Sequence, residues 1–136
     1  MKNLFETKVY YSDTDSYGVA WHGSYLRWME MGRVALCEEF GYKMSDLEAQ
    51  NIVLPVTKID ISYKSSAKFE DEIIVETTVK EFSRLTITFK QVIKNKQTET
   101  INSIANVQIV AVSKEGKLYR TLPECLIKFA KETMED

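Results

Sequence analysis

The apolar residues of this 136-residue chain change their spacing at Pro55, and this change restricts the fold more than any other feature. Before it, from about residue 24 to residue 40, apolar side chains recur every three or four positions, which predicts a helix. Further apolar residues on its other sides indicate a helix largely surrounded by protein. Gly41 is expected to end the helix, and a short second helix is expected with Ser45 and Glu48 in a capping box.

After Pro55 the apolar residues alternate with polar ones, the spacing of half-buried strands. A first strand, with Phe5, Val9 and Tyr11 as its apolar positions, is expected before the helix. The predicted strands are "LFETKVYY" (4–11), "VTKIDISYK" (56–64), "EIIVETTVKEF" (72–82), "LTITFKQVI" (85–93) and "TINSIANVQIVAVS" (100–113). Pro123 opens a short final helix.

Consecutive β runs with short connections predict an antiparallel sheet of about five strands, and the single long helix must cover one face of it. The fold class is therefore α+β, with the sheet curled around the helix in one domain, 1–136. Long strands at a sheet edge invite pairing, so we expect a homodimer joined edge to edge. A dimer of dimers is also plausible, because the helix leaves part of the other face apolar.

Composition argues against several functional classes. Eighteen basic and twenty acidic residues give a net charge of −2 without a basic run, which argues against nucleic acid as a partner. Cys37 and Cys125 fit no metal spacing and are expected to be buried free thiols. The first residues lack an apolar signal, and no segment has the ~18 apolar residues of a membrane span, so we expect a cytoplasmic protein.

The segment before the long helix, "SDTDSYGVAWHGS", gathers Asp13, Asp15, Gly18 and the single histidine, His22. Gly18 permits a close turn. The first turn of a helix presents unpaired N–H groups that bind an oxyanion or a polarised carbonyl. A carboxylate opposite them can attack the carbonyl carbon or take a proton from water. Together these groups form a minimal acyl-transfer site.

Other interpretations of the same residues have to be weighed. Aspartate and serine before a helix also serve as turn and cap residues. A serine hydrolase would use Asp15, His22 and Ser24, but the chain lacks G-x-S-x-G, and side chains two residues apart at a helix start do not face each other. A metal hydrolase needs ligands that one histidine and two distant cysteines do not supply.

The segment resembles the 4-hydroxybenzoyl-CoA thioesterase family of the hotdog fold, especially the short-chain acyl-CoA thioesterases found beside the Tol–Pal envelope system. The family pattern is Asp-x-Asp-x-x-Gly-hydrophobic, an aromatic residue or His, x-x-Tyr, and a helix with Trp or Phe, Glu and Arg. The order of strands and helices extends the resemblance to nearly the whole chain. The matching residues are Asp13, Asp15, Gly18, Val19, His22, Tyr25, Trp28, Glu30 and Arg33.

The resemblance implies a role for each matched residue. Asp15 is the catalytic carboxylate, as nucleophile or as general base, and Asp13 fixes the loop. The backbone N–H of His22 polarises the thioester carbonyl, and its side chain orients water or the acyl group. Gly18, Val19 and Tyr25 contact the substrate, whereas Trp28, Glu30 and Arg33 are structural. Relatives often carry Asn where this chain has Ser24.

Coenzyme A needs cations for its phosphates, and the family places basic residues in strand connections. Ser83 and Arg84, at a turn between strands, are the first candidates, and Lys64 and Lys68 rank below them. Coenzyme A is here part of the substrate, and neither a cofactor nor a metal is expected. The resemblance also implies a homotetramer built from dimers, with active sites at the subunit interface.

The predicted function is hydrolysis of an acyl-CoA thioester to the free acid and coenzyme A. The alternatives are a thioesterase acting on acyl-carrier protein and a non-catalytic hotdog subunit that binds acyl-CoA or a partner protein. Hotdog dehydratases resemble the chain in fold alone, and fold does not fix chemistry. The sequence does not predict the length or the aromatic character of the acyl group.

Overall fold

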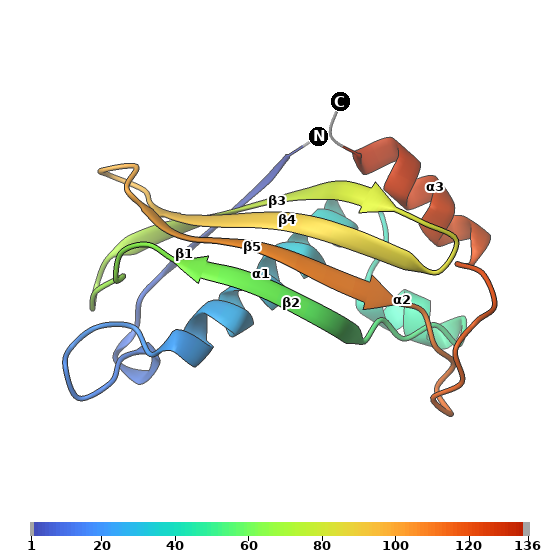
Figure 1. Cartoon of the computed structure of the whole chain (residues 1–136), viewed down its shortest axis with the longest axis horizontal. Helices are drawn as coiled ribbons and strands as arrows, with labels where there is room; N and C mark the ends of the chain where they lie inside the picture. Colours follow the sequence, from blue (N-terminus) through green and yellow to red (C-terminus); the bar gives the residue numbers. More distant parts are fainter. Residues whose placement is uncertain (1, 135–136) are drawn as a thin grey trace.

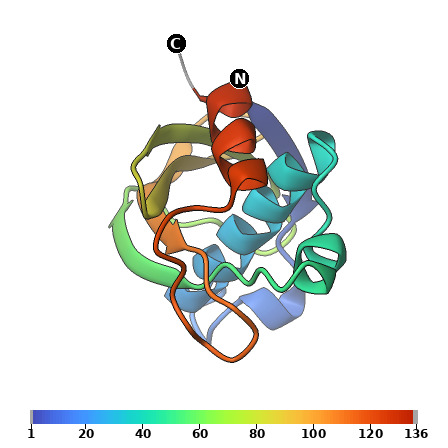
Figure 2. The ribbon, with the colours of Figure 1, turned by 90° about the vertical axis from the view of Figure 1, so that its right-hand side faces the viewer.

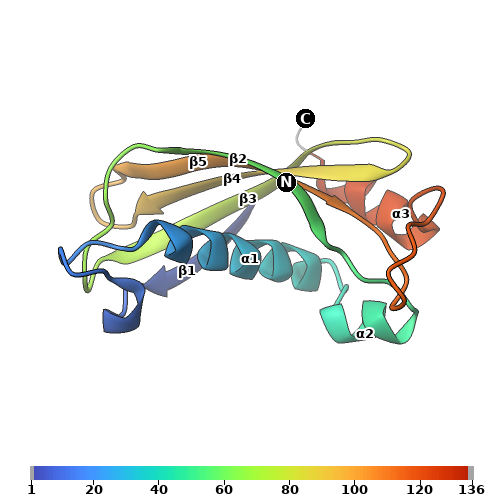
Figure 3. The ribbon, with the colours of Figure 1, turned by 60° about the horizontal axis from the view of Figure 1, so that its bottom comes forward.

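A computed structural model describes residues 2–134. Five antiparallel strands form one sheet in the order β1-β3-β4-β5-β2 (Figure 1). The helix α1 runs along one face of the curved sheet, which confirms the predicted hotdog-type α+β architecture (Figure 3). The elements are β1 (Asn3–Lys8), the 3-10 helix η1 (Tyr11–Asp13), α1 (His22–Glu39), α2 (Met44–Ala49), β2 (Val56–Tyr63), β3 (Glu72–Phe82), β4 (Thr86–Asn95), β5 (Ile101–Val110) and α3 (Glu124–Thr133).

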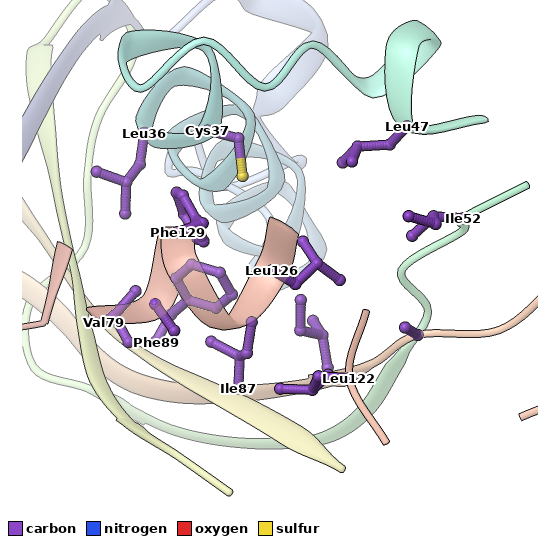
Figure 4. Close-up of a cluster of buried hydrophobic side chains, with 13 residues drawn as sticks. Leu36, Cys37, Leu47, Ile52, Val79, Ile87, Phe89, Leu122, Leu126 and Phe129 are labelled. Carbon is purple, nitrogen blue, oxygen red and sulfur yellow. The ribbon is translucent and has the colours of Figure 1, made fainter. Parts of the chain in front are cut away.

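Two apolar clusters hold α1 against the sheet. Near the start of the helix, Trp28 and Met29 are buried among the strands. Toward its end, Leu36 packs in a second cluster with residues of α3, which covers the same side of the sheet beyond the end of α1 (Figure 2 and Figure 3). Phe129 of α3 points into this cluster, among side chains from α1 and from the strands (Figure 4). The amphipathic final helix therefore closes the end of the core that α1 leaves open.

A polar cluster lies at the centre of the interface between α1 and the sheet. The amide of Gln91 is fully buried, and its Nε2 donates to the Met29 carbonyl at 2.8 Å and to Thr77 Oγ1 at 2.9 Å. Its Oε1 accepts from Arg33 Nη1 at 3.0 Å. Arg33 therefore bonds to the sheet, and within residues 2–134 it forms no ion pair with Glu30. Because every polar atom of the amide is paired, the cluster fixes how α1 sits on the sheet.

Some local predictions are confirmed and others are wrong. Gly41 ends α1 with φ +87°, where a residue with a Cβ is strained. The first strand is predicted to include Tyr11 as an apolar position, but Tyr11 lies in η1 and is 80% exposed. The capping box is wrong, because α2 begins at Met44 after an N-cap at Lys43, so Ser45 lies inside the helix.

The sheet exposes one long edge and a largely polar outer face. The edge strand β2 pairs with β5 on one side only, and Val56, Ile59 and Tyr63 are each about 40–50% exposed. The outer face is apolar at Ile74, Val92 and Ile104, which are partly exposed, and polar along the row Thr78, Lys90, Asn106 and Asp60. None of the helices in the described part of the chain has the length and apolar character needed to cross a membrane.

The two cysteines differ in accessibility, so only one matches the expectation of a buried thiol. Cys37 is buried, and burial raises the pKa of its thiol from 9.0 to about 12, whereas Cys125 is only partly buried. We expect a thiol reagent at about pH 8 to modify Cys125 in the folded protein and Cys37 only after denaturation. Peptide mass spectrometry checks this order, and rapid native labelling of Cys37 would contradict it.

The same shift predicts a pH dependence of stability. Above the ordinary pKa of 9.0 the unfolded chain loses the Cys37 proton, while the folded chain keeps it until its raised pKa of about 12. The unfolded state then binds fewer protons than the folded state, so the free energy of unfolding falls as pH rises through this window. Denaturant melts of the wild type and of Cys37→Ala should diverge there, with the steeper fall in the wild type.

Candidate active site

The loop that precedes α1 is anchored by Asp13, whose side chain is only 1% exposed. Its Oδ2 accepts a hydrogen bond from the Tyr10 N–H at 2.9 Å, and its Oδ1 accepts one from Arg27 Nη2 of α1. Its backbone carbonyl accepts from the Trp21 N–H at 2.8 Å and from Ser24 Oγ at 2.9 Å. Asp13 therefore ties the two ends of the loop together, the role that the family resemblance implied.

Asp15 lies at the start of a tight turn within this loop. Its N–H donates to the Val19 carbonyl at 2.9 Å, and its own carbonyl accepts from the Gly18 N–H at 3.1 Å. Gly18 has φ +78°, which explains the glycine. The carboxylate uses Oδ1 to accept the Tyr17 N–H at 2.8 Å, and Oδ2 accepts no hydrogen bond from residues 2–134. One oxygen of an exposed carboxylate is thus held while the other is free to react.

The first turn of α1 provides hydrogen-bond donors. The helix begins at His22, and the N-cap, Trp21, makes no side-chain cap. Neither the His22 nor the Gly23 backbone N–H donates to an acceptor within residues 2–134. Tyr63, from the end of β2, donates its hydroxyl to the His22 carbonyl at 3.1 Å. Neither Asp13 nor Asp15 caps α1, so the helix start keeps two free donors. The two side chains do serve as turn residues, because Asp13 accepts the Tyr10 N–H at the start of η1 and Asp15 accepts the Tyr17 N–H.

Asp15 contributes to the lining of two neighbouring pockets. The first, of about 390 Å³, has the more polar lining of the two. It is lined by Asp15, Ala20, His22, Tyr25, Tyr63, Lys64, Ser65 and Ser66. The second, of about 450 Å³, has aromatic walls, and it is lined by Tyr11, Thr14, Asp15, Ser16, Gly18 and Phe69. Of the predicted site residues, the structure therefore brings Asp15, His22 and Tyr25 to one pocket and Gly18 to the neighbouring one.

Tyr25 both packs in the core and reaches this pocket. It is 3% exposed, and its ring contacts those of Trp28 and Tyr63 edge-on at 5.2 Å each. Its Oη accepts the Ala67 N–H at 3.0 Å, which leaves the hydroxyl proton free. Burial raises the pKa of Tyr25, so the hydroxyl remains a donor at neutral pH. Val19 lies beside the same segment, in a β-bridge with Lys68.

The sequence did not reveal the pocket wall formed by the end of β2 and the residues that follow it. Tyr63, Ser65 and Ser66 line it, and Asn102 of β5 supports it by donating Nδ2 to the Ser65 carbonyl at 3.2 Å. The run of hydroxyl residues after a predicted strand was the available signal. Its closeness to the loop depends on pairing between residues far apart in the sequence. Lys64, ranked second for the phosphates, lies on this wall.

The turn between β3 and β4, which carries Ser83 and Arg84, lies at the opposite end of the sheet from the loop before α1, which carries Asp15 (Figure 1). The strand β3 separates the two ends, and its eleven residues span roughly 35 Å. Ser83 Oγ contacts Thr86 Oγ1 at 2.8 Å, and Arg84 Nη1 donates to the Arg120 carbonyl at 2.7 Å. One chain therefore does not bring these two residues to the pocket.

The alternative chemistries find no support in the geometry. Ser24 is buried, and its hydroxyl donates to the Asp13 carbonyl, so it is not arranged as a nucleophile activated by His22. Among residues 2–134, no three His, Cys, Asp or Glu side chains are grouped so that they could hold a metal ion.

Known proteins resemble this chain over most of its length. Residues 9–129 match the family described as the Thioesterase-like superfamily. The acyl-CoA thioester hydrolase YbgC of Escherichia coli is 28% identical over 120 residues, covering 88% of this chain and 89% of the relative. The putative acyl-CoA thioesterase YneP of Bacillus subtilis is 37% identical over 78 residues, covering 57% of this chain and 56% of YneP.

Solved structures extend the likeness to the whole fold. The DHNA-CoA thioesterase of Staphylococcus aureus superposes with a TM-score of 0.87 at 27% identity, covering 96% of this chain and 90% of that one. A variant of 4-hydroxybenzoyl-CoA thioesterase, complexed with 4-hydroxybenzoyl-CoA, superposes with a TM-score of 0.83 over 95% and 98% of the two chains. Because the two sequences are only 18% identical, this likeness is evidence for the fold alone. The family match over residues 9–129 confirms the predicted resemblance, and the chain belongs to the Thioesterase-like superfamily.

Proposed function

We propose that this chain hydrolyses an acyl-CoA thioester with Asp15 as the catalytic carboxylate. One observation carries the proposal: Asp15 and His22 line the same pocket, so a free carboxylate oxygen and unpaired helix N–H groups serve one site. The names of the relatives support the reaction class, because YbgC of Escherichia coli is an acyl-CoA thioester hydrolase and YneP is a putative acyl-CoA thioesterase.

The reaction begins with the thioester carbonyl oxygen accepting the N–H groups of His22 and Gly23. These donors stabilise the negative charge that grows on this oxygen, an effect worth ~10²–10³ in rate for one donor. As a general base, Asp15 takes a proton from water, whose oxygen attacks the carbonyl carbon. The carbon–sulfur bond then breaks, and the coenzyme A thiolate leaves and takes up a proton. Tyr25 and the His22 side chain face the same pocket and orient the water and the acyl group.

As a nucleophile, Asp15 would instead attack the carbonyl carbon through Oδ2. Expulsion of the thiolate would then leave a mixed anhydride between Asp15 and the acyl group, which water hydrolyses. The two routes differ in where solvent oxygen ends up. Single turnover in H₂¹⁸O puts ¹⁸O into the Asp15 carboxylate only if water attacks the carboxylate carbon of such an anhydride. Label confined to the product acid, with no trapped intermediate, favours the general base.

The proposal includes the assembly and the surroundings of the site. Lys64, on the pocket wall, is a cation of this chain that can bind the phosphates of coenzyme A, and Ser83 and Arg84 would join only from a second copy. The exposed edge of β2 supports a homodimer, and two dimers would form the homotetramer. We place the enzyme in the cytoplasm, where acyl-CoA is made and used, and propose that it needs no cofactor or metal.

The test is thiol release from acyl-CoAs that range from acetyl to palmitoyl and include benzoyl and hydroxybenzoyl. Turnover of at least one member, lost in Asp15→Asn, supports the proposal, and the best substrate defines the acyl pocket. If the protein turns over the acyl-carrier-protein thioester but no acyl-CoA, the proposed substrate class is wrong and thioester hydrolysis as the reaction stands. Binding of acyl-CoA without turnover of any thioester would instead identify a non-catalytic subunit.

A further inference from the structure

Arg27 forms an ion pair in which its own side chain is half exposed and its partner, Asp13, is buried. The guanidinium lies on the second turn of α1, with its side chain 53% exposed, and donates Nη2 to Oδ1 of Asp13, whose side chain is 1% exposed. The Tyr10 N–H is the other donor to this carboxylate. Among residues 2–134, Asp13 pairs with no cation other than Arg27. A buried carboxylate is costly without a paired charge, so the ion pair with Arg27 offsets the cost of burying Asp13 and helps to hold its side chain in place.

Asp13 in turn holds the part of the loop that carries Asp15. Its carbonyl accepts the Trp21 N–H at 2.8 Å and Ser24 Oγ at 2.9 Å, so it is fixed to the residues on both sides of His22. From residue 14 to residue 20 the loop is closed by its own turn and by the bridge between Thr14 and Ala20. The position of Asp15 relative to the helix donors therefore depends on the Asp13 anchor.

We propose that Arg27 is a positioning residue for the reaction, acting through Asp13 to hold Asp15 opposite the N–H groups of His22 and Gly23. The inference rests on the proposed function, because it concerns the placement of that carboxylate. Arg27 does not line either pocket that contains Asp15, so it acts without touching the substrate. A displacement of about 1 Å between reacting groups lowers rates by up to ~10²-fold, which is the scale of effect that such an anchor controls.

An ion pair between two exposed side chains usually contributes little to stability. A control pair of this kind is therefore needed beside Arg27 and Asp13. The pair Lys128–Glu132 on α3 is the matched control, because both of its side chains are exposed, at 72% and 42%. Lys128→Gln removes a helical cation at the other end of the molecule, whereas Arg27→Gln removes the one beside a buried carboxylate. Arg27→Lys keeps the charge without the planar fork of the guanidinium.

The experiment measures kcat and KM for the best acyl-CoA in Arg27→Gln, Arg27→Lys, Lys128→Gln and Asp15→Asn. Amide hydrogen exchange reports the loop independently, through the N–H groups of Asp15, Ala20 and Trp21, which all donate to backbone carbonyls. We expect Arg27→Gln to lower kcat by ~10-fold or more with KM nearly unchanged. We also expect faster exchange confined to the amides of this loop, partial recovery in Arg27→Lys and no change in Lys128→Gln.

Three outcomes would decide against the proposal or its premise. An unchanged kcat in Arg27→Gln overturns it, provided that Asp15→Asn has lost turnover. A lower kcat accompanied by faster exchange throughout the sheet also overturns it, because Arg27 then serves overall stability. Turnover that persists in Asp15→Asn overturns the proposed function instead, and loop-confined exchange would still show that Arg27 orders the loop.

Discussion

Asp15→Asn is expected to lower turnover of the best acyl-CoA by at least ~10²-fold, because an amide neither accepts a proton from water nor attacks as an anion. The substitution keeps the shape of the side chain and an oxygen that can accept the Tyr17 N–H, which lies 2.8 Å from Oδ1 in the native loop. The turn should therefore survive, and KM should change little. The measurement is the initial rate of thiol release at saturating substrate.

The control for this variant is Asp46→Asn, which removes an exposed carboxylate on α2. It should leave turnover unchanged, so any loss in Asp15→Asn belongs to its position and not to the change in net charge. Equal melting temperatures would show that both variants are folded. If Asp15→Asn and wild type turned over the substrate equally, Asp15 would have no part in the chemistry.

Gly32→Ala is expected to lower the free energy of unfolding by about 1–3 kcal/mol, the usual cost of overpacking a core. An added Cβ would lie 2.7 Å from Thr77 Oγ1 and 2.7 Å from Val75 Cγ1. Thr77 bonds to Gln91, and Val75 is fully buried, so neither neighbour can move aside freely. At a helical position with free space, Gly→Ala would stabilise the protein by ~1 kcal/mol. The sign of the change in stability therefore tests whether Gly32 lies against Thr77 and Val75.

Denaturant unfolding measures this effect, with an unchanged m value as the sign that the unfolding reaction is the same. Glu38→Ala is the control, because it raises helix propensity on an exposed position of α1 without entering the core. We expect that control to stay within ~0.5 kcal/mol of wild type. A Gly32→Ala variant as stable as wild type would contradict the close approach of α1 to the sheet.

The fold was predictable because the patterns that encode it are local. The spacing of three and four before Gly41 defines α1, and the alternation of Ile87, Phe89, Gln91 and Ile93 defines the inward face of β4. The boundaries were less predictable, since Tyr11 follows β1 with an apolar side chain yet turns into η1. Its exposure results from the turn that Asp13 closes with the Tyr10 N–H, an interaction that no spacing encodes.

The residues of the candidate site that lie in one continuous segment were predictable from the sequence. Asp15, Gly18 and His22 follow one another along the loop, and the structure places Asp15 and His22 at one pocket. Residues that arrive from elsewhere in the chain were not predictable. Tyr63 reaches the start of α1 only because the end of β2 lies beside it, and Arg27 meets Asp13 only when the loop folds back on the helix.

The hydrogen bond from Tyr63 to the His22 carbonyl has a consequence beyond the pocket. Tyr63 is the last residue of β2, whose outer edge pairs with no other strand among residues 2–134 and is apolar in places. A partner that paired with this edge would stiffen the strand and, through one hydroxyl, the first turn of α1. If a second copy of the chain pairs there, specific activity should fall on dilution, and Tyr63→Phe should weaken that dependence on protein concentration.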